Sequence, residues 1–257
     1  MSSQISNKSI YDRPQLYDDL MWWKKDDIEF WESIIDKIKP DRVLELCCGT
    51  GRLGIPIIQK GIDYYGVDIS QSFIDFFHQK IINSDYDKGK ITRCDIRNIN
   101  LNQSFDLIIF GFNSLAHLIQ DQDVTNCLNH LRSHMSNHSL LVIDIFVPKV
   151  EFLYNDPKVR SHIMDFIDSE KKLECQLFES TDYDSKTEIN HITWNILNMS
   201  GENQMRYNFE MRMFFPDTLN KLLVDSKYQI SNFYGDYHRT KFNEDSEKQI
   251  LLCKKGI

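Results

Sequence analysis

The stretch of sequence that decides the fold is Glu45-Leu46-Cys47-Cys48-Gly49-Thr50-Gly51-Arg52-Leu53-Gly54. It lies between an expected strand, residues 42–46, and an expected helix, residues 52–60, and its glycines follow the Gly-x-Gly-x-x-Gly pattern of dinucleotide-binding turns. Glycine lets a backbone turn tightly and approach a ligand closely. The stretch therefore predicts a ligand-binding loop at the end of the first strand of a parallel sheet.

Asp68 follows this loop at the spacing typical of a ribose-binding residue. It lies near the end of a second expected strand, residues 63–69, and 19 residues after Gly49. A carboxylate at this place can accept hydrogen bonds from both ribose hydroxyls. The alternative is a helix cap, because Asp-Ile-Ser before a helical run is good N-cap chemistry.

A third acidic residue, Asp95, follows a third expected strand, residues 90–94. It is placed to accept a hydrogen bond from an adenine amino group, while Ile69 and Ile96 enclose the ring. A turn or a cap is again the alternative for Asp95. Together the glycine loop and the acidic strand ends predict an adenosine-bearing cofactor at one edge of the sheet.

The charge of Glu45 distinguishes between two adenosine-bearing cofactors, NAD and S-adenosylmethionine. NAD presents a dianionic pyrophosphate to the loop, whereas S-adenosylmethionine presents a sulfonium with an α-ammonium and a carboxylate, so the two ligands need opposite electrostatics. Glu45 lies four residues before Gly49 and would repel pyrophosphate but attract a cation. S-adenosylmethionine is favoured, and an NAD-dependent oxidoreductase is the alternative; a buried structural carboxylate is the other explanation of Glu45.

Alternating strands and helices define the expected fold. Seven strands are expected over residues 42–46, 63–69, 90–94, 105–110, 140–147, 228–237 and 248–254. Helices are expected over residues 26–38, 52–60, 71–83, 121–135 and 216–225. This alternation predicts a doubly wound, Rossmann-like α/β fold with a mostly parallel seven-stranded sheet.

The pattern of the sequence changes after residue 150, from alternating strands and helices to long β-prone stretches. Three long β-prone stretches, residues 172–183, 188–198 and 206–214, are separated by turn-like residues and predict an inserted antiparallel β subdomain. We therefore expect a helical lid segment over residues 1–40, a cofactor-binding core over 41–150, the inserted subdomain over 151–215, and a helix with closing strands over 216–257.

Four motifs in order resemble those of class I S-adenosylmethionine-dependent methyltransferases. They are Glu45-Leu46-Cys47-Cys48-Gly49-Thr50-Gly51, Val67-Asp68-Ile69-Ser70, Cys94-Asp95-Ile96 and Phe105-Asp106-Leu107-Ile108. Phe112-Asn113-Ser114-Leu115-Ala116-His117-Leu118 is similar to the small-molecule subgroup that includes amino-sugar N-methyltransferases. Cys47-Cys48 departs from the family, which more often has Ala-Cys or Gly-Cys, and we expect this change to alter packing but not activity.

The resemblance implies a role for each matching residue. It places the methionine part of the cofactor on Glu45 and Gly49, the ribose on Asp68, and adenine at Asp95 and Ile96. It also implies cofactor contacts from the loops and from the N-terminal aromatic segment, made by Tyr17, Thr50, Gly51, Arg52, Ile69 and the backbone of Phe112. Substrate contacts are expected from Tyr11, Trp22 and Asn113.

Residues that could do acid–base chemistry are few. His117 follows the fourth strand, near the expected methyl group, and is our candidate general base, with a histidine satisfied within its loop as the alternative. Asp236, Tyr237 and His238 are further candidates. His130, His134 and His138 border an apolar helix face, so we expect no metal site.

Composition limits the partners. The net charge is −8, and neither a basic run nor a long apolar segment is present, which argues against nucleic acid and membranes and favours a small-molecule substrate. Residues 1–8 do not resemble a secretory signal, and the six cysteines show no CxxC pairing, so we expect a cytoplasmic protein with reduced thiols. A homodimer through the inserted subdomain, a nucleic-acid or protein methyltransferase and a non-catalytic cofactor-binding protein stay open as alternatives.

Overall fold

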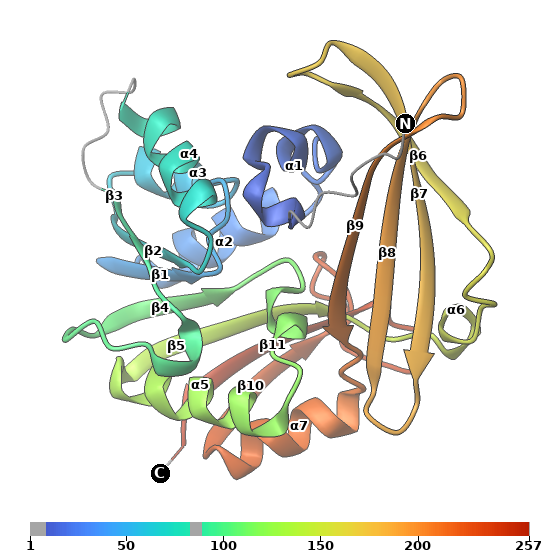
Figure 1. The fold of residues 1–257 in the computed structure, drawn as a ribbon. Helices are drawn as coiled ribbons and strands as arrows, with labels where there is room; N and C mark the ends of the chain where they lie inside the picture. Colours follow the sequence, from blue (N-terminus) through green and yellow to red (C-terminus); the bar gives the residue numbers. More distant parts are fainter. Residues whose placement is uncertain (1–8, 83–88, 257) are drawn as a thin grey trace. The chain divides into compact units, whose positions relative to one another are not determined.

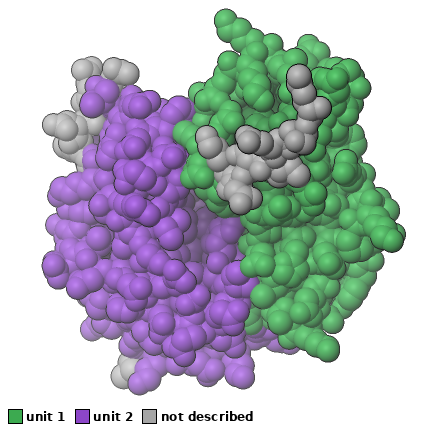
Figure 2. All heavy atoms as spheres, in the orientation of Figure 1, with its two compact units in different colours: residues 1–24, 148–213 green, residues 25–147, 214–257 purple. Residues whose placement is uncertain are grey.

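The computed structural model describes residues 9–82 and 89–256. The polar start, residues 1–8, and Asn83 at the end of an expected helix lie outside the described residues. The chain forms two compact units, coloured separately in Figure 2. Unit 1 comprises Met1–Lys24 and Pro148–Met213, and unit 2 comprises Lys25–Val147 and Phe214–Ile257. The division into four segments expected from the sequence stays a prediction.

Unit 2 contains the expected seven-stranded sheet. Its strands are β1 (Arg42–Leu46), β2 (Asp63–Asp68), β3 (Gly89–Arg93), β4 (Phe105–Phe110), β5 (Met135–Phe146), β10 (Tyr228–Tyr234) and β11 (Lys248–Lys255). The strand order is β10-β11-β5-β4-β1-β2-β3. β1 to β5 pair in parallel, and the last two strands add antiparallel pairs at one side. The predicted fold class is confirmed.

Helices cover both faces of this sheet (Figure 1). They are α2 (Ile28–Ile38), α3 (Gly54–Gln59) and α4 (Gln71–Ile82) on one face, and α5 (Asp121–Ser133) and α7 (Pro216–Asp225) on the other. The first three pack on a core that includes Val43, Leu107 and Val142 from the central strands. Because both faces are covered, residues 107–110 of β4 are four consecutive apolar residues.

The expected boundary between α5 and β5 was wrong. The helix was expected to reach Met135, and the strand to begin at residue 140. Instead α5 ends at Ser133, and Met135 already pairs with Phe105 of β4 before the register shifts. The imidazole of His134 stops the helix there, since its Nδ1 lies 2.8 Å from the carbonyl oxygen of Gln103 and fixes the chain against the segment before β4.

Unit 1 contains an antiparallel sheet separate from the first one. Its strands are β6 (Ser161–Asp168), β7 (Leu173–Asp184), β8 (Ile189–Asn198) and β9 (Asn203–Arg212), in that order. The last three agree with the expected β-prone stretches, but β6 was not expected. The unit also contains the short helices η1 (Ile10–Asp12), α1 (Pro14–Leu20) and α6 (Val150–Leu153).

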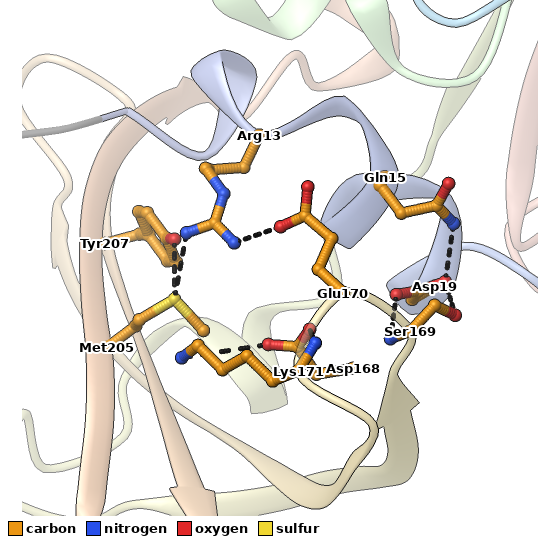
Figure 3. A network of polar contacts seen from close by, with 9 residues as sticks. All are labelled: Arg13, Gln15, Asp19, Asp168, Ser169, Glu170, Lys171, Met205 and Tyr207. Atoms are coloured by element: carbon orange, nitrogen blue, oxygen red, sulfur yellow. Dashed lines mark hydrogen bonds and ion pairs between the residues drawn. The ribbon is translucent and has the colours of Figure 1, made fainter.

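The N-terminal segment packs on one face of this antiparallel sheet. Leu16 and Leu20 of α1 share a core with Leu177, Ile196 and other buried residues of the strands. Polar contacts fasten the same segment to the β6–β7 turn (Figure 3). The guanidinium of Arg13 pairs with Glu170, and the carboxylate of Asp19 accepts the backbone N–H of Ser169 at 2.8 Å. Residues distant in sequence therefore fold as one unit.

Candidate functional site

The acidic residues predicted from the sequence meet at one edge of the parallel sheet in unit 2. β1 and β2 run side by side with Leu46 opposite Val67, and β2 and β3 end with Asp68 opposite Arg93. Glu45, Asp68 and Asp95 therefore lie at or just beyond the carboxyl ends of three adjacent strands. Ligands of open α/β sheets bind at this edge.

Asp68 fixes the glycine loop. Its Oδ2 accepts the backbone N–H of Gly49 at 2.9 Å, and its Oδ1 accepts the backbone N–H of Ser70 at 2.9 Å. The N-terminus of the following helix, α4, is capped by Ser70, whose Oγ accepts the backbone N–H of Phe73 at 3.2 Å. Burial raises the pKa of Asp68, and these backbone N–H groups oppose that rise. Each oxygen uses one of its two lone-pair directions on the backbone, which leaves acceptor capacity for hydroxyl donors.

The three glycines of the loop serve different purposes. Gly49 has φ +57°, and a Cβ there would make only ordinary van der Waals contacts, the nearest at 3.9 Å from the Phe73 ring, so glycine is needed for the turn rather than for space. Gly51 has φ +90°, and a Cβ there would lie 2.5 Å from the ring of Phe77 in α4. Gly54 begins α3, and its Cβ would lie 2.5 Å from the hydroxyl of Tyr64. The loop is therefore packed tightly against α4 and β2.

Gly51→Ala should destabilise the protein more than Gly49→Ala. The first variant combines an unfavourable φ with a clash against the Phe77 ring, and we expect a loss of about 2–4 kcal/mol in the free energy of unfolding. The second has the unfavourable φ but no clash, since its Cβ would make only ordinary van der Waals contacts, and it should lose about 1 kcal/mol. Urea unfolding of both variants measures the difference. Equal losses would contradict the packing role of Gly51.

Glu45 is buried and paired with a residue that the sequence analysis missed. The hydroxyl of Tyr64 in β2 donates a hydrogen bond of 2.6 Å to Oε2 of Glu45. Burial raises the pKa of Glu45 to about 8, against the opposing effects of Tyr64 and Arg52, while the carboxylates of Asp68 and Asp27 add to the rise. A bound cation would stabilise the carboxylate form. Tyr64 could have been found from the register of β1 and β2, because it lies opposite Val43, and Val43 lies two residues before Glu45 on the same face of β1.

Asp27 is a second residue that the sequence analysis missed. It directly precedes α2 and binds Arg52 of the glycine loop. Its carboxylate is fully buried and receives both guanidinium nitrogens of Arg52, at 2.6 and 2.8 Å. The guanidinium carbon of Arg52 also lies 5.1 Å from the centre of the Phe112 ring. Arg52 therefore connects the glycine loop with the loop after β4. A bidentate pair of this kind fixes a side chain's orientation as well as its charge.

The loop after β4 is also fixed by strained backbone and by Asp144. Phe112 and Asn113 both have positive φ values, 49° and 61°. The backbone N–H of Phe112 donates to Oδ2 of Asp144 at 3.2 Å, and Oδ1 of Asn113 accepts the N–H of Phe146 at 2.8 Å. Non-glycine residues with positive φ concentrate at functional sites because the surrounding structure must hold them. Asp144 also accepts the Tyr237 hydroxyl, at 2.9 Å.

Asp95 caps the short helix η2 (Ile96–Asn98), which was the alternative role considered for it in the sequence analysis. Its Oδ1 accepts the backbone N–H of Arg97 at 3.0 Å, and its carboxylate also receives the Arg97 guanidinium, which lowers the pKa of Asp95. Its contact with adenine stays a prediction. Nearby, Ile96 is buried while Ile69 exposes 56% of its surface. Ile69 is an apolar side chain at a strand end that a flat apolar ring could cover.

The remaining predicted residues divide between the units. His117 ends η3 (Ser114–His117) with an exposed side chain, and Thr50 is buried in the glycine loop, where its carbonyl accepts Lys80 at 3.0 Å. Tyr11, Tyr17 and Trp22 belong to unit 1. The rings of Tyr11 and Tyr17 lie 6.2 Å apart, and Trp22 is 62% exposed. Their roles stay predictions.

Other chemistry at the described residues is limited. Across residues 9–82 and 89–256, no group of three or more His, Cys, Asp or Glu side chains could hold a metal ion. All six cysteines are free thiols. None of the helices in the described part of the chain is long and apolar enough to cross a membrane.

The residues at this sheet edge fit an adenosyl ligand with a positive charge. Asp68 has acceptor capacity for hydroxyl groups, Ile69 offers an apolar surface, and the buried Glu45 lies beside the glycine loop. The one arginine of the loop, Arg52, is turned to Asp27. This set suits a sulfonium with an ammonium group better than a pyrophosphate.

Comparisons with known proteins agree with this chemistry. Residues 43–138 match the family model described as a methyltransferase domain. The glycine/sarcosine N-methyltransferase of Aphanothece halophytica is 22% identical over 262 residues, covering 99% of this chain and 92% of that protein.

Solved structures share the fold along the whole chain. The CcbJ methyltransferase of Streptomyces caelestis superposes with a TM-score of 0.83 at 16% identity, covering 97% of this chain and 99% of that one. The sugar N-methyltransferase KedS8 of Streptoalloteichus sp. ATCC 53650 superposes with a TM-score of 0.74 at 12% identity, covering 100% and 98%.

The fold, the strand-end chemistry and the matched domain define a class of enzyme that transfers methyl groups. With its matched domain over residues 43–138, the chain is an S-adenosylmethionine-dependent methyltransferase, and S-adenosylmethionine is its cofactor.

Proposed function

We propose that this enzyme methylates a nitrogen or oxygen of a small molecule by in-line displacement. The acidic edge of the unit 2 sheet, with the buried Glu45 beside the glycine loop, is the observation that carries the proposal. A net charge of −8 favours a small molecule over nucleic acid. The names of two relatives, a sugar N-methyltransferase and a glycine/sarcosine N-methyltransferase, support the same substrate class.

In this proposal the residues of the sheet edge hold the cofactor. Glu45 receives the ammonium of the methionine part, and Asp68 receives the ribose hydroxyls. Asp95, Ile96 and Ile69 surround adenine. The remaining contacts come from the loops after β1 and β4 and from the N-terminal segment, through Tyr17, Gly49, Thr50, Gly51, Arg52 and the backbone of Phe112.

The chain's own residues then orient the reactants. The cofactor supplies an electrophilic methyl group when bound. Asn113 and the aromatic residues Tyr11 and Trp22 position the substrate so that its nucleophile is in line with that methyl group. His117 accepts the proton that an ammonium or hydroxyl substrate must lose.

His117→Ala tests the last role. We expect kcat to fall about 100-fold or more, because a general base typically contributes at least that factor, while binding of S-adenosylhomocysteine is unchanged. His138→Ala, which removes an exposed histidine of β5, is the matched control. An unchanged kcat at pH 7 would remove His117 from the reaction.

Calorimetry tests the proposed function as a whole. S-adenosylhomocysteine, S-adenosylmethionine and NAD are titrated in parallel, and a metabolite collection is then screened for a mass gain of one methyl group. We expect binding of the first two ligands and methylation of a small molecule. A protein that methylates only nucleic acid or protein, or that binds the cofactor without turnover of any metabolite, would contradict the proposal. Our proposal also includes a cytoplasmic location and a homodimer that forms through the four-stranded sheet.

A further inference from the structure

Unit 1 carries a carboxylate with unusual partners. Glu179 lies on β7, directly opposite Trp194 on β8, and its Oε2 accepts the indole N–H of Trp194 at 2.8 Å. Both residues lie on the face of the sheet that α1 partly covers, because Leu177 and Ile196, two residues away along each strand, belong to the core under α1. Glu179 is half-buried, and burial raises its pKa against the opposing effect of the Trp194 hydrogen bond.

Two buried or half-buried carboxylates of the same unit have cationic partners. Asp168 lies 3.8 Å from the ammonium of Lys171, and Glu188 lies 3.3 Å from the guanidinium of Arg212. Among residues 9–82 and 89–256, Glu179 has no such ion pair, and the hydrogen bond that its carboxylate accepts comes from a neutral indole. A half-buried carboxylate without a cation is costly to keep charged, and a bound cation would lower that cost.

The indole that bonds to this carboxylate is the first of a row of aromatic rings. Trp194 meets Phe209 of β9 edge to face, with ring centres 4.9 Å apart. Phe209 in turn lies 6.5 Å from Tyr11, which lies 6.2 Å from Tyr17. Aromatic faces attract ammonium groups and stack on ring ligands. A carboxylate beside such a row of rings has the chemistry that recognises an organic amine.

A polar atom farther along β8 indicates a second contact. Asn190 is 6% exposed, and its Oδ1 has no hydrogen-bond partner among the described residues. It lies on the same face as Trp194, four residues away, or about 13 Å along the strand. A buried carbonyl oxygen without a donor costs free energy that a ligand hydroxyl would recover.

We infer that Glu179, Trp194 and Phe209 form a binding site for the amine of a hydroxylated small molecule, with Asn190 contacting a hydroxyl of the same ligand. The inference rests on the proposed function, since it names the class of substrate: an amine with hydroxyl groups, such as an amino sugar. Glu179 supplies the charge, and the rings of Trp194 and Phe209 exclude water and cover the apolar side of the ligand.

The indole N–H of Trp194 is a direct reporter for this site. Its resonance in a nitrogen–proton correlation spectrum is assigned with Trp194→Phe. Glucosamine, 2-aminoethanol and benzylamine are then titrated, each beside its neutral N-acetyl form. We expect the Trp194 resonance to shift with the amines and not with the N-acetyl forms. Glu179→Gln keeps an acceptor for the indole and should weaken amine binding at least tenfold.

Two further variants complete the test. Glu174→Gln removes an exposed carboxylate from the opposite face of β7 and should leave amine binding unchanged. Asn190→Ala should weaken glucosamine at least threefold but not benzylamine, which has no hydroxyl. The site is overturned if no amine shifts the Trp194 resonance, or if Glu179→Gln binds amines as the unmodified protein does. S-adenosylhomocysteine binding is measured on the same samples, so a failure of the cofactor site is seen separately.

Discussion

Asp68→Ala should abolish measurable binding of S-adenosylhomocysteine while the protein stays folded. Two ribose hydroxyls bonded to a buried carboxylate would contribute about 1.5–3 kcal/mol each, so their loss weakens binding on the order of 100-fold or more. The variant also frees the N–H of Gly49 and Ser70, so the loop loses its support from β2. Calorimetric titration measures the affinity, and circular dichroism checks the fold.

The matched control is Asp63→Ala. Asp63 lies at the opposite end of the same strand, is partly exposed, and pairs with Arg42 at 3.1 Å. Removing this ion pair should cost 1 kcal/mol of stability or less, after about half of the interaction is discounted for solvent, and leave S-adenosylhomocysteine binding unchanged. Unchanged affinity in Asp68→Ala would remove that residue from the cofactor site.

Glu45 should make cofactor affinity and protein stability depend on pH in opposite directions. Its pKa in the ligand-free protein is about 8, raised from the ordinary 4.5 by burial. Only the carboxylate form attracts an ammonium, so affinity for S-adenosylhomocysteine should rise as the pH increases towards 8, by up to about tenfold per pH unit. The folded state prefers the protonated form, so stability without ligand is lost as the pH rises between these two pKa values, by up to roughly 5 kcal/mol.

Glu45→Gln separates the two effects. The amide keeps the shape and an acceptor for Tyr64 but cannot ionise. The ligand-free variant should resist urea better than the unmodified protein at pH 9, and its affinity for S-adenosylhomocysteine should be low and independent of pH between 6 and 9. Tyr228→Phe, which removes a buried hydroxyl bonded to Leu128, is the control for a loss of packing alone. A variant with undiminished affinity at pH 9 would show that Glu45 does not bind the ammonium.

Much of unit 2 could be predicted because its signals are local. The apolar residues of β4 follow one another almost without a break, and those of α7 recur at helical spacing. Both elements were predicted with their observed bounds. The glycine loop and Asp68 could be found from spacing, since consecutive parallel strands end at the same edge of a sheet. The end of α5 could not, because it depends on a bond between His134 and Gln103, which is distant in sequence.

The sequence by itself determined the α/β class, the loop between β1 and α3, the acidic strand ends and, through them, the class of cofactor. Only the tertiary structure decided which partners hold these groups. Glu45 is held by Tyr64, and Arg52 is held by Asp27. The tertiary structure also placed Glu179 beside Trp194 and Phe209. Strand register and burial create these contacts, and both depend on how segments that are distant in the chain pack together.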